Sequence, residues 1–348
     1  MASYKYIIVG AGLTGLSVAY QLMKSGIEDF ILLEGRNRIG GRILTEGGID
    51  LGAAWFQQHH DRVREILQEL EMVSFEQYVS GKGIITSKSG APIQYFEAGA
   101  NGLPTYRIAE GSNKLIEQLA KGFPHKIQLQ TKIIKVENTS EGLKLYTKTK
   151  VFKCHKAVVC IPPKLACQMV FEPSLPNPLI ELMQKTYTWM SHAIKVGLTF
   201  SSPFWREQGF SGIVFGQSSP VTEMYDHSSL DGKVFGLMGF VNEELHFVSE
   251  EERKRIIINF LENLFGKEIN NHLTYSDKDW SKDNFTSIED GKTLPYKSFY
   301  GNALFNKSYH NEKLFFAAAE TSYINGGYMD GAIVSGFETA NKMIQDIT

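Results

Sequence analysis

The sequence YIIVGAGLTG at residues 6–15 decides the fold of this chain. Its first four residues form an apolar, β-prone run that predicts a buried parallel strand. Apolar residues at helical spacing follow Gly15 as far as Gly26, and a second apolar run, 30–33, ends at Glu34. Strand, glycine turn, helix and strand within about 30 residues form a βαβ unit. We therefore expect an α/β fold whose first domain is Rossmann-like.

Three glycines in this stretch, Gly10, Gly12 and Gly15, form a GxGxxG motif. The first allows a tight turn, the second lets the backbone approach a pyrophosphate, and the third lets helix and strand pack closely. Amide groups at the start of the helix favour phosphate there. Glu34, at the end of the next strand, suits ribose hydroxyls. Glycine turns also arise for purely steric reasons, but the strand before the motif and the acidic residue after it favour dinucleotide binding.

A second glycine motif, RNRIGGR, follows at residues 36–42. It could be no more than a polar turn rich in arginine. As a binding element it would add a second phosphate contact, because Gly40 and Gly41 allow close approach of the backbone and Arg42 supplies charge.

Composition excludes several classes of protein. The 348 residues carry 36 Lys plus Arg and 38 Asp plus Glu, a net charge of −2 without a basic block, which excludes a nucleic-acid-binding surface. A hydrophobic share of 43% excludes disorder. Cys154, Cys160 and Cys167 form neither a disulfide framework nor a zinc pattern, so we expect buried small residues and no metal. No signal peptide and no apolar run near the roughly 20 residues of a membrane span is present, and we expect a cytoplasmic protein.

Apolar periodicity places further elements along the chain. It predicts helices at 62–70, 112–120, 249–265 and 331–347, and strands at 127–136, 143–149, 157–161, 194–200, 234–241 and 314–318. Ser112 is the expected cap of the second helix. Residues 81–108, which are rich in Gly, Ser and aromatics, predict a hairpin or irregular structure.

The motifs together resemble the flavin-containing amine oxidase superfamily, which is monoamine oxidase-like, and its short bacterial-type members. Glu34 followed by Gly-Gly-Arg at 40–42 is similar to the FAD version of the fold. The family's later cofactor segments resemble residues 50–55 (DLGAAW), 110–115 (EGSNKL), 129–136, 157–163 and 315–332 (FFAAAETSYINGGYMDGA).

The resemblance implies an FAD cofactor. Covalently flavinylated members carry a cysteine shortly after the position of Trp280, and residues 281–292 hold none, so we expect non-covalent FAD. The implied cofactor-binding residues are Gly10, Ala11, Gly12, Thr14, Gly15, Glu34, Gly35, Arg36, Gly40, Gly41, Arg42, Gly52, Ala53, Ala54, Trp55, Ile133, Trp280, Glu320, Tyr328, Met329 and Ala332.

Three residues are implied as catalytic. Lys195 interrupts the predicted strand 194–200; it could be an exposed lysine on an edge strand, but the resemblance implies a lysine that holds a water near flavin N5. Trp280 and Tyr328 could be core aromatics. The resemblance implies that Trp280 packs beside the flavin and that Tyr328 forms one wall of an aromatic cage for the amine.

Two parts of the family pattern have no firm match. Phe285 and Tyr296 are candidates for the second cage aromatic. His59 and His60 stand where polyamine-type members carry a His-Gly pair, and we expect them on a polar surface or at the rim of a pocket.

The implied activity is FAD-dependent oxidation of a small-molecule amine. Hydride passes from the amine α-carbon to flavin N5, the imine hydrolyses to aldehyde and ammonia, and O₂ reoxidises the flavin with release of H₂O₂. Lys195 would assist proton handling or reoxidation. The expected partners are the amine and O₂, with neither nucleic acid nor membrane, and a homodimer is left open.

Two alternatives remain at this stage. The first is another flavin oxidoreductase on the same fold, acting on amino acids, porphyrinogens or carotenoids. An amino-acid oxidase needs a cation for the substrate carboxylate, and Arg62, Arg107 and Arg206 are the candidates. The second is a flavoprotein without net redox turnover, either an isomerase or a regulatory protein.

The order of the motifs predicts two interleaved domains. The FAD-binding domain comprises 1–80, 109–168 and 283–348. The substrate-binding domain, an α+β unit with a mixed sheet and helices, comprises 81–108 and 169–282. Larger members of the family that the chain resembles carry a helical insertion at the place of 81–108, so the resemblance implies a reduced and more open substrate domain here.

Overall fold

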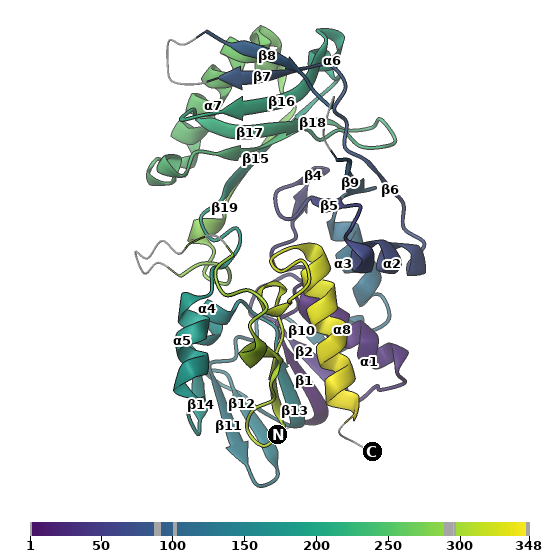
Figure 1. Cartoon of the computed structure of the whole chain (residues 1–348), viewed down its shortest axis with the longest axis vertical. Helices are drawn as coiled ribbons and strands as arrows, with labels where there is room; N and C mark the ends of the chain where they lie inside the picture. The colour runs from purple at the N-terminus through teal and green to yellow at the C-terminus, as the bar shows by residue number, and fades with distance from the viewer. Residues whose placement is uncertain (1, 87–91, 100–102, 289–294, 296, 346–348) are drawn as a thin grey trace.

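A computed structural model describes residues 2–86, 92–99, 103–288, 295 and 297–345. Two large sheets dominate it, one in the lower and one in the upper half of Figure 1. The first runs in the order β10 (Ile127–Gln128), β2 (Phe30–Leu33), β1 (Ala2–Val9), β13 (Val151–Val159), β12 (Gly142–Tyr146), β11 (Lys135–Thr139) and β14 (Val170–Glu172), with β20 (Leu314–Phe316) paired to β13. Strands β10, β2, β1, β13 and β20 are mutually parallel, which confirms the α/β prediction.

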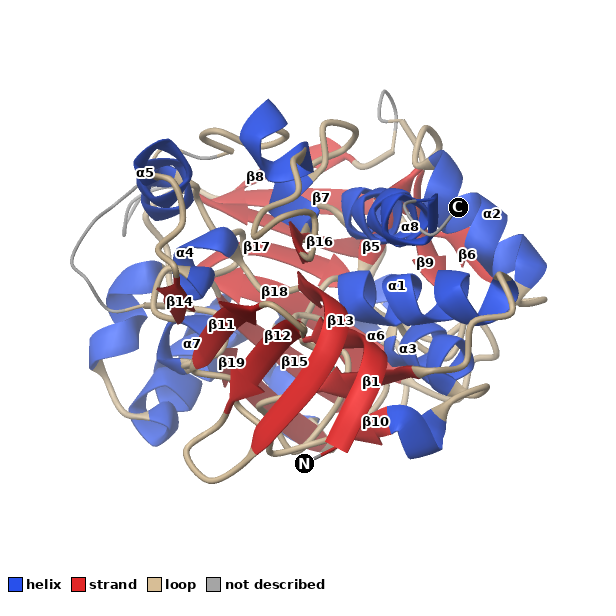
Figure 2. Ribbon diagram, turned by 90° about the horizontal axis from the view of Figure 1, so that it is seen from below, coloured by secondary structure: helices blue, strands red, loops and turns tan. Residues whose placement is uncertain are grey.

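Helices cover both faces of this sheet because the side chains of β1 alternate. Tyr6 and Ile8 face α1 (Leu13–Lys24), α3 (Asn113–Ala120) and α8 (Met329–Gln345), whereas Ile7 and Val9 face the layer that includes α5 (Asn177–Lys185). Figure 2 shows α1, α3 and α8 gathered on one side of β1.

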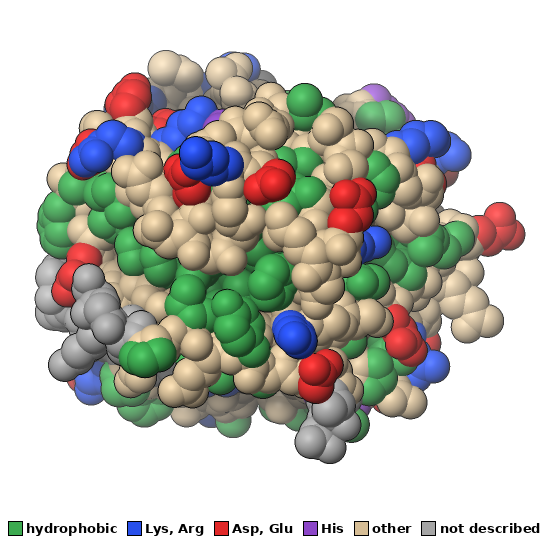
Figure 3. Space-filling model, turned by 90° about the horizontal axis from the view of Figure 1, so that it is seen from above, with side chains coloured by type: hydrophobic (Ala, Val, Ile, Leu, Met, Phe, Trp, Pro, Cys, Tyr) green, Lys and Arg blue, Asp and Glu red, His purple; other side chains and the backbone are tan. Residues whose placement is uncertain are grey.

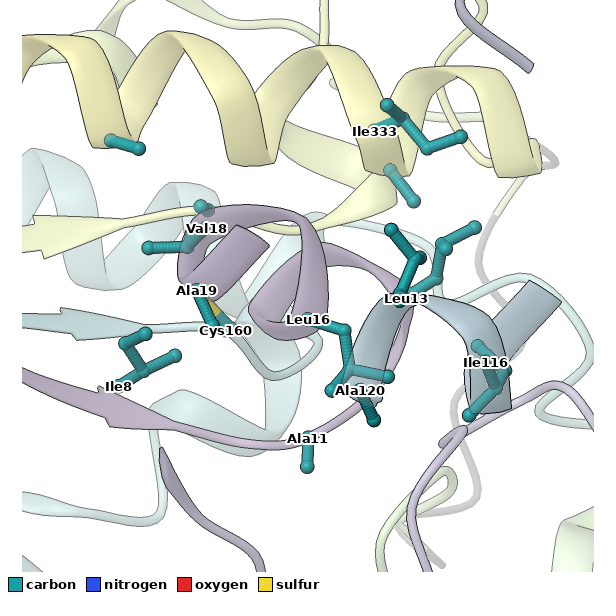
Figure 4. Packing of buried hydrophobic residues seen from close by; sticks show 14 of the residues in the cluster. Ile8, Ala11, Leu13, Leu16, Val18, Ala19, Ile116, Ala120, Cys160 and Ile333 are labelled. Carbon is teal, nitrogen blue, oxygen red and sulfur yellow. The ribbon is translucent and has the colours of Figure 1, made fainter. Parts of the chain in front are cut away.

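The close packing of α1 against α8 begins at the glycine motif. In Figure 4, Ile8 comes from β1, Leu13 and Leu16 come from α1, and Ile333 reaches in from α8. A side chain on Gly336 of α8 would lie 2.7 Å from the carbonyl oxygen of Thr14, so the two helices pack backbone to backbone here.

The second sheet runs in the order β19 (Thr274–Asp279), β15 (Ile194–Phe200), β18 (Phe235–Val241), β17 (Val221–Asp226), β16 (Phe210–Gly216), β7 (Lys82–Thr86) and β8 (Gln94–Glu97). The long helix α7 (Glu250–Phe265) covers one face and packs on alternate residues of β15, β18, β17 and β16. Only β16 and β7 pair in parallel, so the sheet is mixed, as predicted for the substrate domain.

Smaller elements lie between the two sheets in Figure 1. They are β3 (Thr45–Glu46) with β4 (Ile49–Asp50), and β5 (Trp55–Gln57) with β9 (Thr105–Ile108) and β6 (Ser74–Glu76). The remaining helices are α2 (Asp61–Glu69), α4 (Pro163–Ala166) and α6 (Phe204–Glu207).

Three predictions for these elements need correction. The strand expected at 127–136 splits into β10 and β11, because Gln130 has a positive φ of 52° and residues 130–131 bond to the loop after β2. The side chain of Ser112 does not cap α3; the carboxylate of Asp50 accepts its backbone N–H at 2.9 Å instead. The predicted domain boundary at residue 168 precedes β14, which still pairs with β11 in the first sheet.

The hairpin within 81–108 and the burial of Cys154 and Cys160 agree with the predictions. Strands β7 and β8 form the antiparallel hairpin expected within 81–108, and their connection lies outside the described residues. Cys154 and Cys160 are buried, Cys167 is half-buried, and all three are free thiols.

None of the described helices has both the length and the apolar character that a membrane crossing requires. Acidic and basic side chains intermingle on the face in Figure 3.

Candidate functional site

A cavity opens where the carboxyl ends of β1 and β2 meet the start of α8. It holds about 1440 Å³ of empty space, part of it open to solvent. Predicted cofactor residues that line it are Gly10, Gly12, Thr14, Glu34, Gly35, Arg36, Gly40, Gly41, Arg42, Ala53, Ile133, Tyr328, Met329 and Ala332. Ligands of open α/β sheets bind at this edge, so the location is the one expected for a dinucleotide.

The glycines of the first motif are needed for different reasons. Gly10 has a positive φ of 102°, and a Cβ on Gly15 would lie 1.9 Å from the carbonyl oxygen of Gly10. Gly12 differs, because the nearest protein atom to its added Cβ would be Gly41 Cα at 3.7 Å, which is ordinary contact. The protein therefore leaves room at Gly12 that a bound phosphate could use, which fits a dinucleotide cofactor.

We expect Gly12→Ala to weaken FAD binding about tenfold, because a methyl group would crowd the phosphates while leaving the protein's own packing intact. Flavin absorbance and fluorescence titration of the FAD-free protein measure the affinity, and thermal unfolding of the same sample measures stability. Gly15→Ala is the contrasting variant, which should lose stability as well. Unchanged FAD affinity in Gly12→Ala would contradict the assignment of the pyrophosphate to this turn.

The second motif lies directly on the first. The backbone N–H of Gly40 donates to the carbonyl of Ala11 at 2.8 Å. Arg42 lines the cavity, but its guanidinium forms a two-pronged pair with the buried carboxylate of Glu320, at 2.5 and 2.9 Å. Burial acts against this cation, yet Glu320 outweighs it and raises the pKa of Arg42. Glu320 itself is fully buried and does not line the cavity.

Glu34 organises the loop around the cavity. Its carboxylate accepts backbone N–H bonds from Ala11 at 2.7 Å and from Arg36 at 2.8 Å. The Nε atom of Arg36 is buried and has no hydrogen-bond partner within the described residues. A carboxylate and an unsatisfied donor at one end of the cavity fit the polar groups of a nucleotide.

Lys195 lies on β15, between β19 and β18, and is 1% exposed, so it is not on an edge strand. Its Nζ donates to the carbonyls of Asp50 and Gly52, at 2.9 and 2.7 Å. The rings of Trp55 and Phe240 lie 5.3 and 5.0 Å from the same nitrogen. Burial away from water lowers the pKa of Lys195 to about 7. Lys195 touches the backbone on either side of Leu51 and does not itself line the cavity.

The two implied aromatic residues differ in position. Trp280 is fully buried, and its Nε1 donates to the carbonyl of Leu51 at 2.8 Å, on the same segment that binds Lys195. It does not line the cavity. Tyr328 does line it, with 37% of its surface exposed. The ring of His60 lies 5.1 Å from that of Tyr328, and Lys297 Nζ lies 4.2 Å from the Tyr328 ring centre.

The structure corrects the expectations for the less certain residues. His60 is buried at 1% exposure and packs against Tyr328, whereas His59 is exposed. Phe285 lines the cavity beside Gly35 and Arg36, not beside Tyr328, so it does not form the second wall of the cage. The other candidate, residue 296, lies outside the described residues.

Some implied cofactor residues support the cavity without lining it. Ala11, Gly15, Gly52, Ala54, Trp55, Trp280 and Glu320 form this group. Other lining residues were missed, including Cys160, Ile161, Leu165, Gln168, Met169, Trp189, Met190, Ala318 and Gly327. Residues 160–163 already resembled a family segment, but nothing local in the sequence marks Gln168 or Trp189.

No candidate for a substrate-carboxylate arginine lines the cavity in the part of the chain that the structure describes. Arg62 pairs with Glu65 on the exposed side of α2. Arg107 is buried, donates to the carbonyls of His227 and Ser228, and has its pKa lowered by burial to about 10. Arg206 pairs with Asp226.

Fold and cavity define a dinucleotide-binding protein with a Rossmann-like first sheet. A model of the family described as flavin containing amine oxidoreductase matches residues 13–84 and 86–344, and the chain belongs to this family. The chain is therefore an amine-oxidising oxidoreductase, and its cofactor is FAD.

Known relatives agree with this assignment. The chain is 26% identical to a probable flavin-containing monoamine oxidase A of Dictyostelium discoideum, over 98% of this chain and 97% of the relative. Among solved structures, wild-type putrescine oxidase bound to putrescine has a TM-score of 0.84 at 19% identity, covering 99% of both chains. Cyclohexylamine oxidase from Brevibacterium oxydans has a TM-score of 0.86 at 17% identity, again over 99% of both chains. These two likenesses establish a shared fold.

Proposed function

We propose that the chain is an amine oxidase that uses O₂ as its electron acceptor, with Lys195 and Tyr328 at the reacting end of the FAD site. Bound FAD would take a hydride equivalent at N5 from the amine α-carbon, leaving an imine that water hydrolyses to aldehyde and ammonia, and would reduce O₂ to H₂O₂. The observation that carries the proposal is the buried Lys195, held by the two carbonyls that precede the cavity residue Ala53.

Lys195 has the chemistry to hold a water. A neutral amine has two N–H groups and one lone pair. The two N–H groups are used by the carbonyls of Asp50 and Gly52, which leaves the lone pair to accept from a water or to take a proton. A pKa of about 7 lets both forms exist at neutral pH.

Tyr328 and the start of α8 shape the rest of the reacting end. Tyr328 precedes Met329, the first residue of α8, and both line the cavity. The half-exposed ring offers an apolar and cation-attracting wall for an amine. The helix N-terminus favours negative charge beside it. Trp280 would act indirectly. Its Nε1 donates to the carbonyl of Leu51 and so fixes the backbone segment to which Lys195 is hydrogen-bonded.

The pKa of Lys195 predicts a pH dependence. Burial lowers this pKa to about 7, so about half of the lysine is neutral at pH 7 and about a tenth at pH 6. If the neutral amine is the active form, the limiting rate of flavin reduction at saturating amine falls about tenfold per unit below pH 7 and levels off above it. Stopped-flow flavin absorbance measures this rate. A limiting rate without an inflection between about pH 6 and 8 contradicts the role.

An aerobic panel of amines tests the proposed function. Purified holoenzyme is mixed with aliphatic, aromatic and polyamine substrates, and H₂O₂ is followed by a peroxidase-coupled assay. Peroxide and aldehyde in equal amounts support an amine oxidase. Peroxide only with amino acids would favour an amino-acid oxidase, although the described arginines that we considered do not reach the cavity. Absence of peroxide with every amine would overturn O₂ as the acceptor.

We also propose that the chain folds as the two interleaved domains expected from the sequence and that the protein is cytoplasmic. The strands of the first sheet come from 1–80, 109–168 and 283–348, with β14 as the exception, and this supports the predicted division. Non-covalent attachment of FAD is supported by the absence of cysteine from residues 281–292. Three free thiols support a reducing compartment.

A further inference from the structure

One face of the second sheet is not covered by α7, and the strand register places a row of side chains across it. Lys195 on β15 pairs with Phe240 on β18, Phe240 pairs with Glu223 on β17, and Glu223 pairs with Phe215 on β16. Directly paired residues of antiparallel strands point to the same face of a sheet. Their sequence neighbours, such as Val196 and Met224, pack under α7 with the rest of that core.

Aromatic rings lie along this row, on the face of the sheet that carries Lys195. The ring of Trp55 lies 4.9 Å from that of Tyr225 and 6.5 Å from that of Phe240, and Lys195 Nζ lies within 5.3 Å of both Trp55 and Phe240. Phe215 continues the aromatic surface, with its ring 6.3 Å from Tyr225 and 39% of its surface exposed. The face is continuous with the site of Lys195.

Glu223 is the one acidic residue among the four in the row. It is exposed, and it accepts a hydrogen bond at 2.7 Å from the hydroxyl of Tyr225. Burial and the neighbouring Glu223 raise the pKa of Tyr225, so this hydroxyl keeps its proton and stays a donor. Within the described residues, no basic side chain forms an ion pair with Glu223, and the second oxygen of its carboxylate accepts no hydrogen bond. A carboxylate fixed among aromatic rings is a favourable place for an ammonium group.

We propose that Glu223, with Tyr225, Phe240 and Phe215, binds a second ammonium group of the substrate, so that the preferred substrate is an aliphatic diamine. The inference rests on the proposed amine oxidase function. Two strand spacings separate Lys195 from Glu223, about 10 Å between their backbones. If the reacting amine lies beside Lys195, as in the proposed function, a second amine can reach Glu223 across an aliphatic spacer but not from an adjacent carbon. The apolar spacer would lie along Phe240 and Trp55.

The test compares 1,5-diaminopentane with 1-aminopentane, which has the same chain length and one ammonium group. Flavin reduction is followed anaerobically in wild type, in Glu223→Gln and in Glu252→Gln. Glu252 is an exposed carboxylate on α7, on the opposite side of the sheet, and serves as the matched control. We expect Glu223→Gln to lower the second-order rate constant of flavin reduction by the diamine about tenfold. The rate constant with the monoamine should stay unchanged in this variant, and both rate constants should stay unchanged in Glu252→Gln.

The outcomes separate this inference from the function on which it rests. A wild-type preference for the diamine that disappears in Glu223→Gln supports the second ammonium site. Equal loss with both substrates, or no loss with either, overturns the site while amine oxidation stands. Reduction by other amines but by neither of these two also overturns the diamine assignment. If no amine reduces the flavin, the proposed function fails and the inference fails with it.

Discussion

Lys195→Met should lower the rate of amine-driven flavin reduction or of reoxidation by O₂ about 100-fold, the scale of a lost proton-handling group. FAD content should stay unchanged, because Lys195 binds the carbonyls of Asp50 and Gly52 and does not line the cofactor cavity. Methionine keeps a side chain of similar length in the buried site but removes the basic amine nitrogen and its N–H donors. Stopped-flow absorbance separates the two half-reactions.

The matched control is Lys144→Met, a lysine on β12 of the first sheet that faces no part of the cavity. It should behave as wild type in both half-reactions. Parental rates in both half-reactions for Lys195→Met would show that the assignment of this lysine is wrong. A variant that has lost its FAD would instead place Lys195 among the residues that build the cofactor site.

Glu320→Gln should destabilise the FAD-free protein by about 3 kcal/mol. Glu320 is fully buried and holds the guanidinium of Arg42 by two hydrogen bonds, so the change leaves a largely buried cation without its partner. Burial of the unpaired guanidinium carries most of this cost. Urea unfolding gives the free energy directly.

Glu65→Gln is the matched control for that loss. Glu65 and Arg62 form an ion pair of the same 2.5 Å length, but both side chains are more than half exposed. Exposed pairs contribute at most about 1 kcal/mol. Equal free energies of unfolding for the two variants would mean that the Arg42–Glu320 pair does not stabilise the fold.

Much of the cofactor half could be predicted from sequence because its signals are local. A turn that forbids a Cβ at Gly15, an apolar run on each side and an acidic residue at position 34 all lie within one βαβ unit. A few neighbouring residues therefore indicate the backbone conformation, and Gly10, Gly12 and Glu34 among them line the cavity.

The remainder depends on distant partners. Nothing near Ser112 reveals that Asp50 caps its helix from 62 residues away, and nothing near His60 reveals that Tyr328 covers it. Residues 129–134 have the composition of a strand, but residues 130 and 131 bond to the loop at Glu34 and Arg36, so composition misassigns this stretch. The row from Lys195 to Glu223 exists only because three strands pair in one register, which hydrophobic pattern alone does not specify.

Anaerobic addition of an amine to the purified holoenzyme tests the central claim most directly. We predict that at least one aliphatic amine bleaches the oxidised-flavin absorbance of the wild type in a single stoichiometric step, that admitted O₂ restores it, and that Lys195→Met slows one of these two changes. Flavin that stays oxidised with every amine, or that is both bleached and reoxidised equally fast without Lys195, would contradict the account.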